Sequence, residues 1–107
     1  MVDVRSRLTA AELASRTAEV DDLQIVDVRN PGEVDGGAVP GSVNIPLAAL
    51  ADRAGDLDPA RPTVVYCAGG YRSSIAASYL ASRGFADVSD LLGGYDAWAT
   101  LQNANSG

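Results

Sequence analysis

The stretch that decides the fold lies in the second half of the chain and consists of Thr63-Val64-Val65-Tyr66-Cys67-Ala68-Gly69-Gly70-Tyr71-Arg72-Ser73-Ser74. Its first five residues form a short and largely apolar run, which is typical of a strand buried on both faces. A glycine-containing loop follows, and the Ala-rich segment 73–83 predicts a helix that ends at Gly84. A strand, a loop and a helix in this order predict one unit of a parallel sheet covered by helices.

The same alternation of strands and helices extends in both directions from this stretch. Further strands are predicted over residues 23–28, 42–45 and 86–90. Helical segments are predicted over residues 10–17, 47–53 and 95–101. The Gly- and Pro-rich segment 30–41 is expected to form a loop. Together these elements predict an α/β domain with a central, mostly parallel sheet of four or five strands and helices on both faces.

Length and composition indicate one globular domain. The chain has 107 residues, of which 47% are apolar and 21% charged, so it can bury a core of its own. We expect a single domain over 1–107, with its core over about 9–101 and a polar tail over 102–107. No apolar run approaches the ~18 residues of a membrane span, and residues 1–5 contain no apolar signal-peptide core. A cytoplasmic protein without a membrane partner is therefore expected.

Several classes of function are excluded by residues that the chain lacks. The net charge is −6 and there is no Lys, which disfavours a nucleic acid as partner. There is no His, which removes His-based general bases and His-containing metal sites. The single Cys cannot form an internal disulfide or a multi-Cys metal site. We expect no metal and no cofactor, and the thiol of Cys67 is the remaining candidate for chemistry.

The surroundings of Cys67 in the sequence favour a reactive thiolate over a buried structural cysteine. In parallel sheets, ligands bind at the carboxyl ends of strands, where Cys67 is predicted to lie. A helix N-terminus and inward-facing loop amides would favour the charged sulfur. Arg72 adds a cation that could hold an anionic substrate. The predicted nucleophile is Cys67, and the predicted substrate-binding residues are Ala68, Gly69, Gly70, Tyr71, Arg72 and Ser73.

Asp27 and Arg29 are further candidates for lining the site, because Asp27 lies near the carboxyl end of a predicted strand. The alternative for Arg29 is an ion pair with Glu33 that orders the long loop. A cysteine phosphatase is disfavoured, because such enzymes hold phosphate in a Cys-x5-Arg loop. Here only four residues separate Cys67 from Arg72.

From about residue 9 to residue 101 the chain resembles the rhodanese-like, or thiosulfate sulfurtransferase, domain family in its single-domain form. Five segments carry the resemblance, in order: 9–13, 25–33, 37–46, 67–72 and 92–98. The fourth, Cys-Ala-Gly-Gly-Tyr-Arg, is similar to the six-residue active-site loop of that family. The resemblance implies a three-layer α/β/α fold with a mostly parallel sheet.

The resemblance also implies sulfur transfer. The Cys67 thiolate would take the sulfane sulfur of thiosulfate or of a low-molecular-weight persulfide and pass it to cyanide or a thiol. Tyr71 could contact a larger donor, so glutathione persulfide is expected to give a higher kcat/KM than thiosulfate. Two alternatives stay open: a persulfide carrier that serves a protein acceptor, and a rhodanese-like binding module without catalysis.

Overall fold

Five short strands form one central sheet in the computed structural model, which describes residues 6–106. They are β1 (Ser6–Leu8), β2 (Gln24–Asp27), β3 (Val43–Asn44), β4 (Thr63–Tyr66) and β5 (Val88–Leu91). Their order in the sheet is β1-β5-β4-β2-β3, and every neighbouring pair is parallel. The predicted α/β architecture is confirmed, and in the described residues the sheet is parallel throughout.

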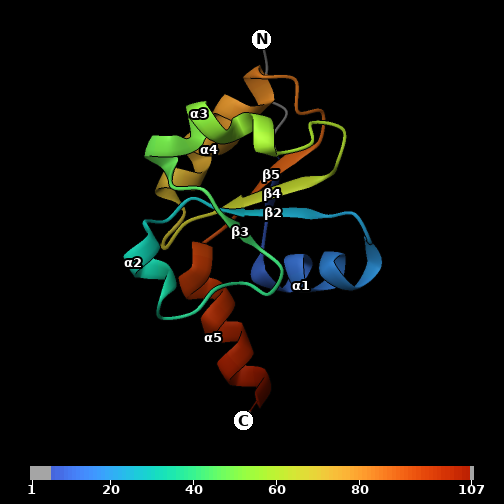
Figure 1. Cartoon of the computed structure of the whole chain (residues 1–107). Helices are drawn as coiled ribbons and strands as arrows, with labels where there is room; N and C mark the ends of the chain where they lie inside the picture. The colour runs from blue at the N-terminus through green and yellow to red at the C-terminus, as the bar shows by residue number, and fades with distance from the viewer. Residues whose placement is uncertain (1–5, 107) are drawn as a thin grey trace.

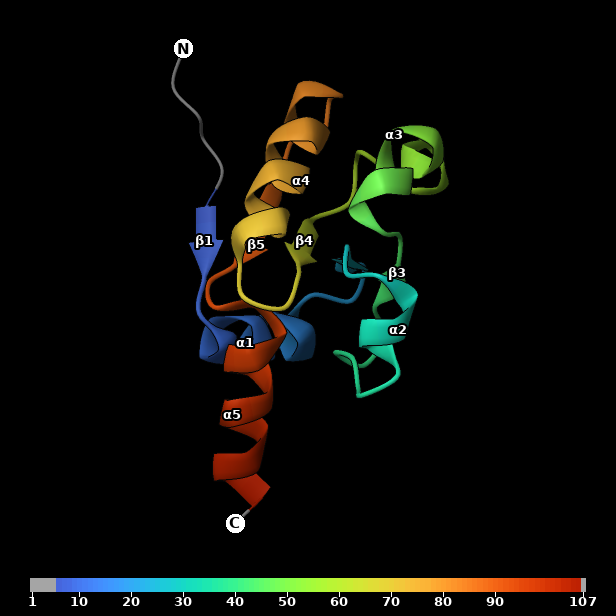
Figure 2. The ribbon, with the colours of Figure 1, turned by 90° about the vertical axis from the view of Figure 1, so that its left-hand side faces the viewer.

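Helices cover both faces of this sheet (Figures 1 and 2). On one face lie α3 (Leu50–Arg53) and α4 (Tyr71–Ser82), and on the other lie α1 (Ala10–Glu19) and α5 (Gly94–Ser106). A short helix, α2 (Pro31–Val34), precedes β3, and two 3-10 turns, η1 (Leu47–Ala49) and η2 (Ala54–Asp56), flank α3. No helix between residues 6 and 106 is long and apolar enough to span a membrane.

The central strand β4 separates two apolar cores. Its neighbours β2 and β5 pair with it on either side, and all of its residues are buried. Val65 packs in the core beneath α4 with Ala77 and Leu80, whereas Tyr66 packs in the core beneath α1 and α5. Successive side chains of a strand point to opposite faces, so Cys67, directly after Tyr66, faces the α4 side. The sheet thus fixes the side on which the thiol emerges.

The structure corrects the predicted elements in three places. β1 was not predicted; three residues are too few for a periodic pattern, and its strand partner is β5 at the far end of the chain. Helix α2 lies inside the segment 30–41 that was expected to be a loop. Helix α5 continues to Ser106, because residues 102–106 contain no Gly or Pro to end it. The predicted absence of a signal sequence concerns residues 1–5, which lie outside the described residues.

Candidate active site

Cys67 lies at the carboxyl end of β4, where the chain turns through a tight loop into α4. Figure 2 shows this loop between β4 and the first turn of α4. Gly70 caps the helix with φ of +106°, a left-handed conformation that other residues rarely adopt. The helix then begins at Tyr71, so its N-terminus points back at the loop. This local sequence folds the chain around the sulfur.

The Sγ atom of Cys67 is surrounded by hydrogen-bond donors. The side chain is only 1% exposed. The backbone amides of Gly70 and Ser73 donate to Sγ at 3.1 and 3.4 Å, and the Ser73 hydroxyl lies 3.7 Å away. Burial raises the pKa of the Cys67 thiol, but the hydrogen bonds from Ser73, Gly70 and Gly69 outweigh burial, and the net pKa is lowered. The loop is therefore built to hold sulfur as an anion.

The carbonyl side of the loop is held by the start of α5. The amide of Tyr95 donates to the Cys67 carbonyl at 2.7 Å, and that of Asp96 donates to the Ala68 carbonyl at 3.1 Å. Gly94 packs so closely beneath both carbonyls that a Cβ there would overlap them. In the sequence, Gly93 and Gly94 stand directly before a predicted helical segment, a pattern typical of a chain reversal. The glycine doublet was the signal, but its contact with the loop depends on the tertiary fold.

Arg72 does not stand free beside the sulfur. Its Nη1 and Nη2 donate to the two carboxylate oxygens of Glu33 at 2.7 and 2.9 Å, and each side chain is about one-third exposed. The Arg72 guanidinium and the Asn30 amide together lower the pKa of Glu33 to about 2. Arg72 is therefore ion-paired with a carboxylate of α2.

Asp27 and Arg29 lie together on the opposite face of the sheet from Cys67. Arg29 donates to both oxygens of Asp27, at 2.8 Å for the closest contact, and the Tyr66 hydroxyl donates to the same carboxylate at 2.8 Å. The predicted Arg29–Glu33 ion pair is wrong, because the Glu33 side chain pairs with Arg72; Arg29 reaches only the Glu33 backbone carbonyl. Both candidate residues contact Tyr66, the neighbour of Cys67 in the chain, and neither is hydrogen-bonded to the sulfur.

The other predicted loop residues differ in how deeply they are buried around Cys67. Ala68 is half-buried, Gly69 is exposed and Gly70 is buried. Tyr71 projects into solvent with 80% of its surface exposed. Ser73 is fully buried, and its hydroxyl also donates to the Gly70 carbonyl at 3.3 Å. The structure thus brings together the predicted loop residues, and it separates them from Asp27 and Arg29.

Sequence reasoning missed one cation beside the loop. Arg7 of β1 donates through Nη2 to the buried carboxylate of Asp90 at 3.2 Å. The same Nη2 lies 3.7 Å from the place that a Cβ on Gly70 would take. Arg7 could not be connected with Cys67 before β1 was known to lie at this edge of the sheet.

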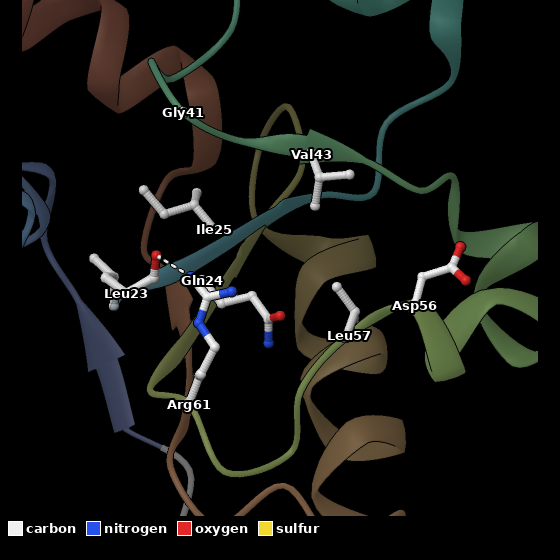
Figure 3. Close-up of a pocket in the computed structure, with 8 residues that line it drawn as sticks. All are labelled: Leu23, Gln24, Ile25, Gly41, Val43, Asp56, Leu57 and Arg61. Carbon is white, nitrogen blue, oxygen red and sulfur yellow. Dashed lines mark hydrogen bonds between the residues drawn. The ribbon is translucent and has the colours of Figure 1, made fainter. Parts of the chain in front are cut away.

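A separate cavity of about 260 Å³ lies at the other end of the strands, around the start of β2 (Figure 3). Its polar side chains are engaged within the protein: Gln24 bonds to Thr63, and Arg61 donates to the backbone carbonyls of Asp22 and Leu23. Cys67 lies at the carboxyl end of β4 and does not line this cavity. Within residues 6–106, no three His, Cys, Asp or Glu side chains are grouped so as to hold a metal ion.

Comparisons with known proteins agree on one family. The family model described as "Rhodanese-like domain" matches residues 9–101. The chain is 40% identical over 91 residues to the thiosulfate sulfurtransferase GlpE of Shewanella oneidensis, covering 85% of this chain and 89% of that one. It is 33% identical over 94 residues to a sulfurtransferase of Allochromatium vinosum, covering 88% of each. A rhodanese-like domain protein from Staphylococcus aureus superposes with a TM-score of 0.81 at 32% identity, over 87% of this chain and 90% of that one.

Proposed function

Since this chain belongs to the rhodanese-like domain family and is a sulfurtransferase of that type, we propose that Cys67 is its nucleophile and sulfur carrier. In this proposal a sulfane sulfur moves from thiosulfate or a low-molecular-weight persulfide to Cys67, and then to cyanide or a thiol. The observation that carries the proposal is the pair of backbone amides, from Gly70 and Ser73, that donate hydrogen bonds to the buried Sγ.

The reaction divides into two balanced displacements on sulfur. The Cys67 thiolate attacks the outer sulfur of thiosulfate, an S–S bond forms, and sulfite leaves with the electron pair of the bond that breaks. Cyanide or a thiolate then attacks the outer sulfur of the Cys67 persulfide and restores the thiolate. Covalent catalysis of this kind gives ping-pong kinetics. No histidine is needed, because the transferred group is sulfur rather than a proton.

The active-site loop suits both the free thiolate of Cys67 and the persulfide that the first displacement forms. The amides that hold the Cys67 thiolate also suit the charge of a persulfide, whose outer sulfur carries the anion. Tyr71 stands exposed at the start of α4, where it is free to contact the body of a larger donor. On this basis glutathione persulfide is proposed to give a higher kcat/KM than thiosulfate, and the opposite ranking would contradict that role of Tyr71.

The test is the intact mass of the protein after brief exposure to thiosulfate and, separately, to glutathione persulfide. The wild type should gain one sulfur atom, and cyanide should remove it. Cys67→Ser is the matched control, because it replaces only the sulfur, and it should gain nothing. If neither donor adds sulfur to the wild type, Cys67 is not the sulfur carrier and the non-catalytic binding module replaces this proposal.

A protein acceptor is a second candidate, favoured by exposed apolar side chains near the loop. Tyr71, Ile75 and Leu92 are three of the four large hydrophobic residues that are exposed in the described chain. Ile75 lies one turn after Tyr71 on α4, and Leu92 precedes Gly93, whose amide lies beside Gly70. A carrier for a protein acceptor would form the Cys67 persulfide but turn over slowly with cyanide and small thiols, and steady-state assays distinguish the two.

A further inference from the structure

The ion pair between Arg72 and Glu33 has two-point geometry. Nη1 lies 2.7 Å from Oε1 and Nη2 lies 2.9 Å from Oε2. An end-on guanidinium–carboxylate pair of this kind occupies the fork that would otherwise bind an oxyanion in the same way. An anion entering the loop therefore competes with Glu33 for Arg72.

Glu33 is fixed in this position by its own helix. Its carboxylate accepts the Asn30 amide at 2.9 Å and closes the capping box of α2. With a pKa of about 2, it is charged throughout the pH range of enzyme assays. The carboxylate is thus a permanent negative charge paired with Arg72, in the first turn of the helix that follows the Cys67 loop.

The second cation near the loop is paired as well. Arg7 forms an ion pair with the buried carboxylate of Asp90, with 3.2 Å between Nη2 and Oδ2. Among the described residues, each guanidinium placed beside the loop therefore has an acidic partner. The charged side chains beside the loop therefore offer no surplus of positive charge to a doubly charged donor, which must also approach a Cys67 thiolate.

We propose that Glu33 is a specificity-determining residue that disfavours donors with two negative charges at the sulfane group and favours donors with one charge or none, such as alkyl persulfides. The donor preference rests on the proposed function, whereas the control of anion entry by Glu33 does not. Thiosulfate and methanethiosulfonate give the matched comparison. Both transfer sulfur to the Cys67 thiolate, with sulfite leaving from the first and methanesulfinate from the second, but the first donor carries one more negative charge.

Entry of anions is tested first by alkylation of Cys67 with iodoacetate and iodoacetamide, which are similar in size and differ by one charge. In each reaction the thiolate displaces iodide from carbon. Glu33→Gln keeps the length of the side chain and the capping oxygen but removes the charge. It should raise the ratio of the iodoacetate to the iodoacetamide rate constant about fivefold at low ionic strength, the effect of one charge a few ångströms away in water. High salt should shrink the gain.

Two control variants separate charge from structural damage. Asp35→Asn removes an equal charge from the exposed C-terminal end of the same helix, whereas the carboxylate paired with Arg72 is that of Glu33. It should leave the ratio within about twofold of the wild type. Glu33→Asp shortens the side chain but keeps the charge, and it should not raise the ratio. An unchanged ratio in Glu33→Gln, or an equal rise in Glu33→Asp or Asp35→Asn, would overturn the proposal.

The donor preference is tested by the ratio of kcat/KM for thiosulfate to that for methanethiosulfonate. Glu33→Gln should raise this ratio about fivefold, whereas a purely structural role would lower kcat for both donors alike. If the wild type forms no Cys67 persulfide from either donor, the proposed function fails and the donor preference fails with it. The alkylation ratios would still decide whether Glu33 controls the entry of anions.

Discussion

Cys67, the proposed nucleophile, shows how a few neighbouring residues set the pKa of one side chain. Burial in an apolar core opposes a charged sulfur, yet the net pKa of the thiol is lowered, because donors from Gly70, Gly69 and Ser73 converge on it. The Ser73 amide donates to Sγ at 3.4 Å, the Ser73 hydroxyl oxygen lies 3.7 Å from Sγ, and both contacts lower the pKa of the thiol. The lowered pKa of the thiol therefore depends on hydrogen bonds that the loop supplies locally.

We predict that Ser73→Ala raises the pKa of the Cys67 thiol above its wild-type value. The variant removes the hydroxyl contact and keeps the backbone amide, so the thiolate loses part of its stabilisation. The pH profile of iodoacetamide alkylation measures this change, since the rate follows the thiolate fraction, and the profile should move to higher pH. Ser82→Ala, at the other end of α4, should leave the profile in place. Equal profiles for Ser73→Ala and wild type would contradict the assigned role of the hydroxyl.

The elements around the loop act as its supports. Helix α5 donates two amides to the loop carbonyls, and Gly94 allows this approach because it has no side chain and adopts φ of +60°. On the opposite face, the Tyr66 hydroxyl connects β4 to Asp27 at the end of β2 and accepts the Val39 amide at 3.0 Å. The loop geometry is thus a property of several packed elements.

Gly94→Ala is predicted to destabilise the protein by about 1–3 kcal/mol or more, because its Cβ would overlap the loop carbonyls in a left-handed conformation. Chemical denaturation followed by circular dichroism measures the loss. Gly32→Ala in α2 is the matched control: a Cβ there meets nothing within 4 Å and its φ is ordinary, so it should be neutral or slightly stabilising. Similar losses in both variants would contradict the close packing at Gly94.

Tyr66→Phe is predicted to destabilise the protein by about 1–3 kcal/mol, because it leaves the buried Asp27 carboxylate and Val39 amide without this partner. The change should appear in the free energy of unfolding. Tyr79→Phe, a half-buried tyrosine on α4, should cost less than about 0.5 kcal/mol. If Tyr66→Phe lowers the free energy of unfolding as little as Tyr79→Phe does, the Tyr66 hydroxyl adds no stability through its bond to Asp27.

At the scale of the whole molecule, one sheet is shared by two cores. Its order, β1-β5-β4-β2-β3, places β4 in the middle and therefore places Cys67 at the centre of the carboxyl edge. Leu80 packs in the core beneath α4, and Leu13 and Trp98 pack in the core beneath α1 and α5. Because the same strands contribute to both cores, neither face can lose its packing independently of the other.

We predict that residues 1–107 unfold as one cooperative domain. The fluorescence of Trp98, the single tryptophan, reports on one core, and far-ultraviolet circular dichroism reports on helices of both faces. The two signals should share one midpoint. Leu13→Ala and Leu80→Ala, one on each face, should each cost about 2–5 kcal/mol and shift both signals together. Separate midpoints would indicate two independent units.

Much of the site could be predicted because its information is local. The apolar run before Cys67, the glycines after it and the helix-forming segment that follows specify β4, the loop and α4 in one continuous stretch. The absence of His and the single Cys left Cys67 as the candidate. The loop predicted over 30–41 followed from the Gly and Pro content of that segment, and α2 inside it has only four residues, too few to show a helical period.

By itself, the sequence determined the fold class and the identity of the thiol, because periodicity, turn residues and composition act over a few neighbouring positions. Only the tertiary structure decided which carboxylate faces Arg72, which helix holds the loop carbonyls, and that β1 brings Arg7 to the loop. Asp27 and Glu33 are both acidic and both close to Arg29 in sequence, so composition could not choose between them. The choice follows from alternation across the sheet and from the packing of α2, which bring together residues far apart in the chain.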